Sequence, residues 1–220
     1  MAKEKEQIDK LKFEKEEEAK GNFLIAGMDE VGRGPLAGPV CVACVIMPLD
    51  DIIEGVDDSK KLSEKKRNLL FEQIKEKAIA YSIEMVDEQT IDKINILEAT
   101  KLCMKNAVEK LSIKPDVVLV DAISKLDTDV NLRGIIKGDA LSYSIGCASI
   151  LAKVTRDNLM VKLAEEYPEY GFEKHKGYGT KVHIEALKEY GPCIYHRLSF
   201  LKFLEKWLCL MKKLGKMVKN

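Results

Sequence analysis

Two adjacent carboxylates, Asp29 and Glu30, end an apolar segment that begins at Phe23 and come directly before a turn rich in Gly and Pro. Carboxylates in such a place cost free energy unless water, a cation or a basic group satisfies them. Glycines after a strand end let another backbone approach the chain closely. The pattern predicts a site that can hold a metal ion and admit a polymer substrate.

Two further acids follow apolar or turn segments in the first 140 residues. Asp121 ends the run DVVLVD, and Asp139 follows Gly138 where a helix is expected to open. Carboxylates at neighbouring strand ends converge, repel one another and need divalent cations to compensate. An oxygen-only ligand set favours Mg²⁺ or Mn²⁺ over zinc, and two such ions can promote phosphoryl hydrolysis. For Asp139 the sequence also allows a plain helix-capping role.

The adjacency of Asp29 and Glu30 sets a condition on the backbone. Neighbouring residues of a regular strand point to opposite faces, so we expect the chain to leave extended geometry at this pair. Gly32 and Gly34 would make that departure easy.

Residues 32–37 also fit G-x-G-x-x-A, the dinucleotide-binding pattern. That pattern needs a helix that opens at the glycines and meets the pyrophosphate. Pro35, Gly38 and Pro39 intervene here, and an apolar, β-branched run follows. A dinucleotide site is therefore excluded.

Apolar periodicity and turn residues predict an α/β domain followed by a helical C-terminal region. Strands are expected at residues 23–29, 39–47, 78–86, 116–121 and 132–137. Helices are expected at residues 63–77, with Ser63 as the N-cap, and at 95–111 and 142–167. A loop that contains Gly and aromatic residues is expected at 167–181, followed by a helix that ends at residue 190 and a last helix at 199–213. Residues 3–20 alternate acids and bases and are expected to form a solvated helix or a frayed extension.

The composition is that of an ordinary globular protein, with 46% hydrophobic and 33% charged residues. No apolar run approaches the roughly 20 residues needed to cross a bilayer, and no secretory signal is visible, so we expect the cytoplasm. The six cysteines lie scattered in apolar segments, as expected of buried thiols. Net charge is zero, but residues 171–220 hold 11 Lys and Arg against 4 Asp and Glu. This asymmetry suggests a basic C-terminal portion beside an acidic one.

The run GMDEVGRGPLAGPV at residues 27–40 closely resembles the signature of type 2 ribonuclease H, the bacterial ribonuclease HII family. Further segments resemble the family in the same order: DSKKLS from residue 58, DA at 121, KGD at 137, ASILAKVTRD from 148, HKGYGTK from 175 and HRLSF from 196. These segments cover roughly residues 22–203.

The resemblance implies an RNase H-like mixed β-sheet flanked by helices, with a C-terminal helical subdomain. It implies an endonuclease that cuts the RNA strand of RNA–DNA hybrids and nicks duplex DNA 5′ of embedded ribonucleotides, leaving 3′-OH and 5′-phosphate ends. Carried over by position, the metal-binding and catalytic carboxylates are Asp29, Glu30, Asp121 and Asp139, which agrees with the cluster reached from the strand ends. They would hold two ions, Mg²⁺ or Mn²⁺.

The same resemblance implies a set of substrate contacts. The backbone of Gly32, Arg33 and Gly34 would read the ribose 2′-OH, which separates RNA from DNA. Tyr178 would pack on the sugar of the next nucleotide, although its residue type alone leaves loop packing equally open. Lys60, Lys153 and Lys181 are candidate phosphate contacts, and taken singly each is better explained as a solvated lysine.

This reading divides the chain into a charged extension (residues 1–20), a catalytic domain (21–203) and a basic tail (204–220). The expected partners are RNA–DNA hybrids and ribonucleotide-containing duplex DNA, with no membrane, and the expected state is a monomer. The intact Gly-Arg-Gly turn differs from the substituted turn of ribonuclease HIII, so cleavage at single ribonucleotides is expected. The alternatives are a non-catalytic nucleic-acid-binding module and another metal-dependent nuclease on the same acidic cluster.

Overall fold

The structure is a computed structural model that describes residues 9–121 and 126–204. Its sheet has five strands in the order β3-β2-β1-β4-β5. The strands are β1 (Ile25–Val31), β2 (Val40–Ile46), β3 (Ala80–Val86), β4 (Val117–Asp121) and β5 (Asn131–Ile135). β4 pairs in parallel with β1 and with β5. The eight residues between β1 and β2 are too few for a parallel crossover, so that pair is antiparallel and the sheet is mixed.

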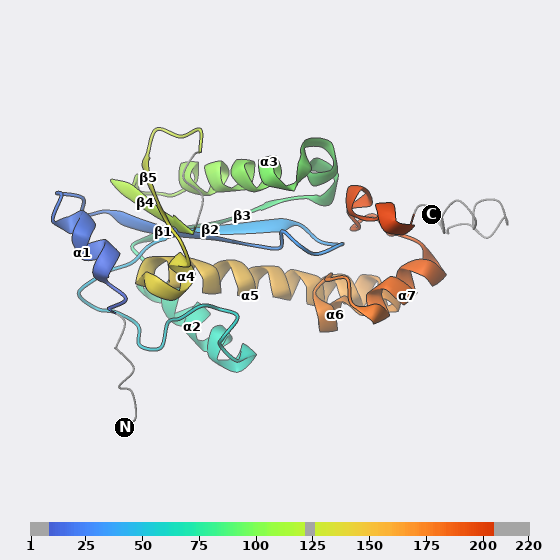
Figure 1. The fold of residues 1–220 in the computed structure, drawn as a ribbon. Coiled ribbons are helices and arrows are strands. Elements are labelled where there is room, and N and C mark those ends of the chain that lie inside the picture. Colours follow the sequence, from blue (N-terminus) through green and yellow to red (C-terminus); the bar gives the residue numbers. More distant parts are fainter. Residues whose placement is uncertain (1–8, 122–125, 205–220) are drawn as a thin grey trace, which may run out of the picture. The chain divides into compact units, whose positions relative to one another are not determined.

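Helices precede and separate the strands, and only helices and turns follow β5 in the described part of the chain (Figure 1). They are α1 (Lys12–Glu18), α2 (Glu64–Lys77), α3 (Glu88–Glu109), α4 (Gly138–Leu141), α5 (Tyr143–Glu166), α6 (Phe172–His175) and α7 (Lys181–Tyr190). Three short 3₁₀ turns complete the described part: η1 (Pro168–Tyr170), η2 (Leu198–Phe200) and η3 (Lys202–Leu204).

The chain divides into two compact units, which we describe separately. The first unit consists of residues 1–30, 42–84 and 104–154, and the second of residues 31–41, 85–103 and 155–220.

The first unit contains most of the sheet and packs helices on both of its faces. Figure 1 shows α4 and the start of α5 on one face and the end of α3 on the other. A core cluster joins β1, β4, β5 and α5 through Ile25, Val117, Leu119, Ile135 and Ile145. At Gly27 any Cβ atom would lie 2.0 Å from the backbone carbon of Ser144, so glycine is what allows α5 to lie directly on β1.

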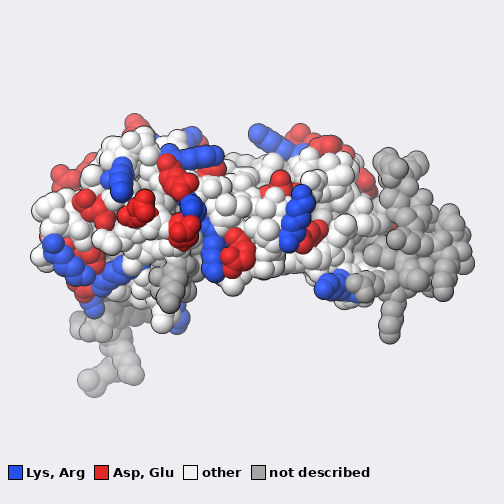
Figure 2. Space-filling view, turned by 90° about the horizontal axis from the view of Figure 1, so that it is seen from above, with Lys and Arg blue, Asp and Glu red and all other residues white. Residues whose placement is uncertain are grey.

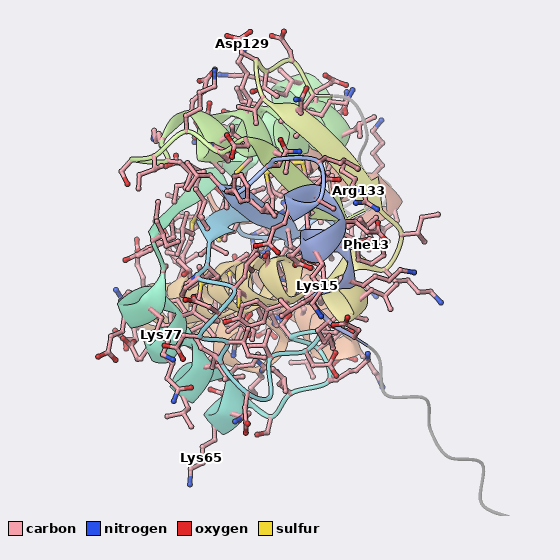
Figure 3. All side chains as sticks on the ribbon, turned by 90° about the vertical axis from the view of Figure 1, so that its left-hand side faces the viewer. Phe13, Lys15, Lys65, Lys77, Asp129 and Arg133 are labelled. Carbon is pink, nitrogen blue, oxygen red and sulfur yellow. The ribbon has the colours of Figure 1, made fainter. Side chains whose placement is uncertain are left out.

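Helix α1 contradicts the expectation of a solvated helix or frayed extension for the part of residues 3–20 that is described. Glu14 and Glu17 are buried. Arg133 of β5 donates to the carboxylates of Glu16 and Glu17, and its guanidinium lies 5.2 Å from the Phe13 ring centre. Figure 3 shows Arg133 and Phe13 beside each other. The acidic residues that suggested solvent exposure are thus bound by a partner distant in sequence.

The second unit is mainly helical around an aromatic and aliphatic core. Its buried residues include Ala37 of the loop after β1, Met160 of α5, Phe172 of α6, Leu187 of α7 and Leu201. An isolated bridge pairs Ala37 with His196, and no helix opens at residues 32–37, in agreement with the exclusion of a dinucleotide site.

Several expected elements differ in their bounds. Helix α3 begins at Glu88, seven residues earlier than expected, and is kinked at Asn95, whose φ is 68°. A break at Ser142 separates α4 from α5. The helix expected at 199–213 is represented by the turns η2 and η3 up to Leu204, and its remainder lies outside the described residues. Ser63 caps α2 as predicted, accepting from the backbone N–H of Lys66.

In the described ranges, no helix combines the length and the apolar character that a membrane span requires.

Candidate active site: a carboxylate cluster and a glycine turn

Strand β1 carries both members of the acidic pair. It stays extended through Asp29 and Glu30 to Val31, so the expectation that the chain leaves strand geometry at the pair is wrong. The departure comes at Gly32, whose φ is +92°. Asp29 is only 6% exposed, Glu30 is half-buried, and the Glu30 N–H donates to the Asp29 carboxylate over 2.8 Å. Asp29 is therefore the last buried residue of the strand.

Asp121 and Asp139 are brought together by the junction between β4 and α4. Asp121 is the last residue of β4, and its Oδ1 accepts from the Gly138 N–H over 3.0 Å. Lys137, with a φ of 59°, turns the chain sharply so that Asp139 falls in the first turn of α4. Asp139 is 8% exposed. Asp121 and Asp139, although distant in sequence, are thus neighbours in the fold.

The carboxylates of the first unit are coupled electrostatically. Burial raises the pKa of Asp29 well above its ordinary value, and the charges of Glu30 and Asp139 raise it further. Hydrogen bonds from Ser149 and from the Glu30 N–H act in the opposite direction. Burial also raises the pKa of Asp139, together with the charges of Asp58 and Asp121. Asp29 is therefore coupled to Glu30 and to Asp139, and Asp139 is coupled to Asp121.

Lys60 belongs to the same cluster. Its Nζ lies 3.7 Å from Oδ2 of Asp139. Partial burial lowers the pKa of Lys60, but the attraction of Asp29, Asp139, Asp58 and Asp121 outweighs it and raises the pKa above its ordinary value. One cation thus faces several acids, and the negative charge is only partly compensated.

The donor set of this cluster fits a hard divalent cation. Its ligands are carboxylate oxygens, which suit Mg²⁺ or Mn²⁺. Over residues 9–121 and 126–204, no three His, Cys, Asp or Glu side chains are already arranged as a metal-binding group. Mutual repulsion opposes such an arrangement, and a bound cation would offset it.

The glycine turn, residues 32–34, lies in the second unit, and two buried arginines hold the backbone of this turn and of the loop that follows it. Arg197 donates to the carbonyls of Gly32, Arg33 and Gly38 over 2.5–3.1 Å. Arg156 donates to the carbonyls of Pro39, Ala37 and Lys176 over 2.9–3.0 Å. Burial lowers the pKa of Arg197 to about 9, with a further contribution from the Arg156 charge. The carbonyls of the turn are thus fixed, and with them the direction of its amide groups.

Gly32 has no room for a side chain in this arrangement. A Cβ atom there would lie 2.3 Å from Nε of Arg156, in addition to the strain of a positive φ. At Gly34 the nearest atom to a Cβ would be Cε1 of Tyr178, at 3.7 Å. Tyr178 is 43% exposed. The structure therefore brings the predicted tyrosine against the predicted turn.

The remaining predicted contacts are dispersed. Arg33 is exposed on the turn. Lys153 is half-buried on α5 in the first unit. Lys181 begins α7 in the second unit, is highly exposed and forms a 3.9 Å ion pair with Glu185. The roles predicted for these side chains rest on the resemblance alone.

Charge on the surface is less asymmetric than the sequence suggested. The described residues 171–204 hold six Lys or Arg against three Asp or Glu, and the rest of the C-terminal excess lies beyond residue 204. On the face seen in Figure 2, charges of both signs are interspersed. The described part of this face offers no single basic stripe.

Sequence reasoning missed the residues that support these two sites. Ser149 bonds to Asp29 and also lies 2.9 Å from the Ser59 hydroxyl. Arg156 and Arg197 stand in the segments that resemble the family, but no role was predicted for them. For Arg197 the available signal was a charged residue within the largely apolar run CIYHRLSFL, which often marks a buried and partnered group, whereas the polar neighbours of Arg156 gave no such signal.

Solved structures with this arrangement are type 2 ribonucleases H. The ribonuclease H2 of Pyrococcus horikoshii OT3 superimposes with a TM-score of 0.69 and 28% identity, covering 88% of this chain and 99% of that one. RNase HII of Archaeoglobus fulgidus, solved in complex with PCNA, gives a TM-score of 0.70 and 27% identity over 83% and 96% of the two chains. Fold and carboxylate cluster together define the class: ribonuclease H endonucleases, hydrolases that cleave the RNA of RNA–DNA hybrids.

The family follows from the sequence comparison. The ribonuclease HII family model matches residues 26–203. Ribonuclease HII of Caldicellulosiruptor bescii is 60% identical over 192 residues, which are 86% of this chain and 93% of that protein. The chain belongs to the ribonuclease HII family. The predicted family, fold class and enzyme class are thereby confirmed.

Proposed function

We propose that this ribonuclease H nicks duplex DNA on the 5′ side of embedded ribonucleotides, in addition to cutting the RNA strand of hybrids. The observation that carries the proposal is the coupled cluster of Asp29, Asp121 and Asp139 facing Lys60, joined through β1 to the arginine-supported glycine turn. Only Val31 separates Glu30 from Gly32, so an acidic site and a sugar-reading turn are adjacent along the chain.

The cofactor proposed for this cluster is a pair of Mg²⁺ or Mn²⁺ ions held by Asp29, Glu30, Asp121 and Asp139. When bound, such ions compensate charge and promote attack of water in phosphoryl hydrolysis. Asp29 and Asp139 are positioned by burial, and Asp121 by the Gly138 N–H. Lys60 supplies a positive charge that can contact the phosphate of the substrate.

The reaction is an in-line displacement at phosphorus. Water forms a bond to phosphorus, the bond from phosphorus to the upstream O3′ breaks, and the leaving oxygen takes up a proton. The upstream strand ends in a 3′-OH, and the ribonucleotide keeps its 5′-phosphate.

Substrate choice would come from the second unit. Arg197 holds the carbonyls of Gly32 and Arg33. The amide groups of Gly32, Arg33 and Gly34 can hydrogen-bond a ribose 2′-OH, the group that DNA lacks. Tyr178 offers an exposed ring beside Gly34 for the adjoining sugar. We further propose Lys153 and Lys181 as phosphate contacts beside Lys60, and a cytoplasmic monomer as the working state.

A duplex carrying one ribonucleotide tests the proposal. The wild-type protein should nick it 5′ of the ribonucleotide with Mg²⁺ or Mn²⁺ and leave it intact with a chelator, and Asp29→Asn should abolish nicking while retaining binding. Intact substrate with undiminished binding would indicate a non-catalytic module. Cleavage at positions unrelated to the ribonucleotide would indicate another nuclease on the same cluster.

A further inference from the structure

The three histidines of the chain gather in the second unit, where the proposed chemistry does not use them. His183 and His196 are buried, and their Nε2 atoms lie 3.0 Å apart. The ring of His175 stacks on that of His183 with centroids 4.5 Å apart. Phe172 lies against all three rings.

The hydrogen bonds of this cluster determine the position of each proton. The carbonyl of Tyr178 can only accept, so Nδ1–H of His183 donates to it over 2.9 Å. Nε2 of His183 must then accept, which makes Nε2–H of His196 the donor between the rings. Nδ1 of His196 is left as an acceptor and receives the Cys193 N–H over 3.0 Å. Every step has one donor and one acceptor, and both rings are neutral.

The chain of bonds ends on the loop that carries the exposed tyrosine. The Tyr178 carbonyl also accepts from the Thr180 N–H, and the Tyr178 N–H donates to the His175 carbonyl. His175 itself bonds to the Tyr170 carbonyl and accepts from the Gly177 N–H. The backbone of Tyr178 is therefore held on both sides while its ring remains exposed beside Gly34.

We infer that His183 and His196 are positioning residues that hold the Tyr178 carbonyl through a single tautomeric relay and thereby orient its ring for the nucleotide junction. This inference rests on the proposed role of Tyr178 in substrate choice. Neither histidine reaches the carboxylate cluster in the described contacts, so they act only through the tyrosine.

Neutral rings are required for the relay. Burial lowers the pKa of His183 to about 4 and that of His196 to about 3. The titratable groups that face the pair are His175 from α6, Tyr170 from η1 and Cys193 from the following loop. Cys193 is in turn influenced by Glu169 and Glu88. A proton added to Nε2 of His183 would face the Nε2–H of His196 and break the bond between the rings. A proton added to Nδ1 of His196 would instead face the Cys193 N–H and break that bond.

Cleavage by two His183 variants tests the inference. His183→Leu removes the donor to Tyr178 and should lower kcat/KM at a single ribonucleotide by about tenfold, the value of one hydrogen bond to a positioned group. The same variant should change cleavage of a long hybrid much less. His183→Asn keeps an N–H at the place of Nδ1 and should recover most of the activity. Equal losses on both substrates, or no recovery with Asn, would overturn the inference.

A Tyr178→Ala background separates this inference from the proposed function. If Tyr178→Ala itself leaves the ratio between the two substrates unchanged, the proposed junction role of Tyr178 fails. If that ratio changes but His183→Leu lowers it further in the Tyr178→Ala background, the relay fails while the role of Tyr178 stands.

Nitrogen chemical shifts of ¹⁵N-histidine in the wild-type protein give a readout that no loss of folding can mimic. We expect Nδ1–H on His183 and Nε2–H on His196. The opposite tautomer on either ring would overturn the relay.

Discussion

Asp29 occupies a place where a carboxylate destabilises the fold. It is buried in β1 and carries a raised pKa, first from burial and then from the charges of Glu30 and Asp139. Because the folded-state pKa is raised, the free energy of unfolding decreases as the pH rises from the ordinary value of 3.8 through the raised one, and this cost persists at neutral pH. Such a cost is typical of a residue kept for chemistry.

Replacing Asp29 by Asn should therefore have opposite effects on stability and activity. In chelator, the variant should unfold at a higher temperature than the wild type, with a gain of roughly 1 kcal/mol. Mg²⁺ should raise the melting temperature of the wild type more than that of the variant, because the cation offsets repulsion that the variant lacks. Calorimetry with and without Mg²⁺ measures both effects, and a variant less stable than the wild type in chelator would contradict the repulsion argument.

Arg197 is a buried charge of the second unit, as Asp29 is of the first, and its hydrogen-bond partners are backbone carbonyls. Arg197→Ala leaves the carbonyls of Gly32, Arg33 and Gly38 without their donor, at about 1–3 kcal/mol for each group that stays buried. We expect a loss of stability of several kcal/mol and a selective loss of cleavage at single ribonucleotides. Lys202→Ala, at an exposed position of the same unit, is the matched control and should change neither quantity. Denaturant unfolding and the ratio of the two cleavage rates measure these effects.

Helix α1 shows at the level of elements how a charged segment becomes part of the support of a site. Oε1 of Glu14 accepts from the Ser142 hydroxyl over 2.6 Å and from the Ser144 N–H over 3.0 Å. Just before the helix, Nζ of Lys10 donates to the Ala140 carbonyl over 2.7 Å. These bonds hold the junction between α4 and α5, and α4 carries Asp139.

Glu14→Ala should accordingly weaken both the fold and catalysis. The hydroxyl and the amide lose a charged acceptor, for which we expect a destabilisation of about 2 kcal/mol. Cleavage of hybrids and of single ribonucleotides should fall together, because the change acts on the carboxylates and not on the glycine turn. Glu18→Ala, exposed on the same helix, should leave both unchanged. A normal rate in a fully folded Glu14→Ala protein would disprove the supporting role of α1.

At the level of the whole molecule, the chain passes repeatedly between its two units, so one short stretch serves both. β1 ends with acids that belong to the first unit, and the next residues form the turn of the second. The histidines of the second unit add a pH dependence to global unfolding, because the unfolded chain binds protons that the folded protein does not.

The sign of that pH dependence follows from the lowered pKa values. Unfolded histidines titrate near 6.5, whereas His183 and His196 do so at about 4 and about 3 when folded. Between these values the free energy of unfolding should fall with decreasing pH, by up to about 1.4 kcal/mol per pH unit for each histidine. Urea unfolding between pH 7 and 5 measures the slope, and the difference between wild type and a His183 variant removes the contribution of carboxylates with raised pKa values such as Asp29 and Asp139. A His183→Leu protein should show a shallower slope, and an unchanged slope would contradict a buried neutral His183.

Local pattern was enough to predict much of this molecule. Apolar runs bounded by turn residues predicted β1, β2, β3 and β4 to within two residues, and a serine followed by a helical pattern predicted the cap of α2. Such signals are carried by neighbours in the chain, which is why they can be recognised without the fold. Asp121 illustrates the point, because an acid that ends an apolar strand already indicated a site.

The tertiary structure decided which charged side chains are buried and which partners they meet. The sequence by itself determined the family, the strand ends and the acids, but not that Glu14 would be buried, that Arg156 and Arg197 would hold the glycine turn, or that three histidines would share one core. The helical capping role left open for Asp139 also required the fold, which places that acid beside Asp121 and Lys60. Burial and partnership depend on residues remote in sequence, and their free energies exist only once those residues meet.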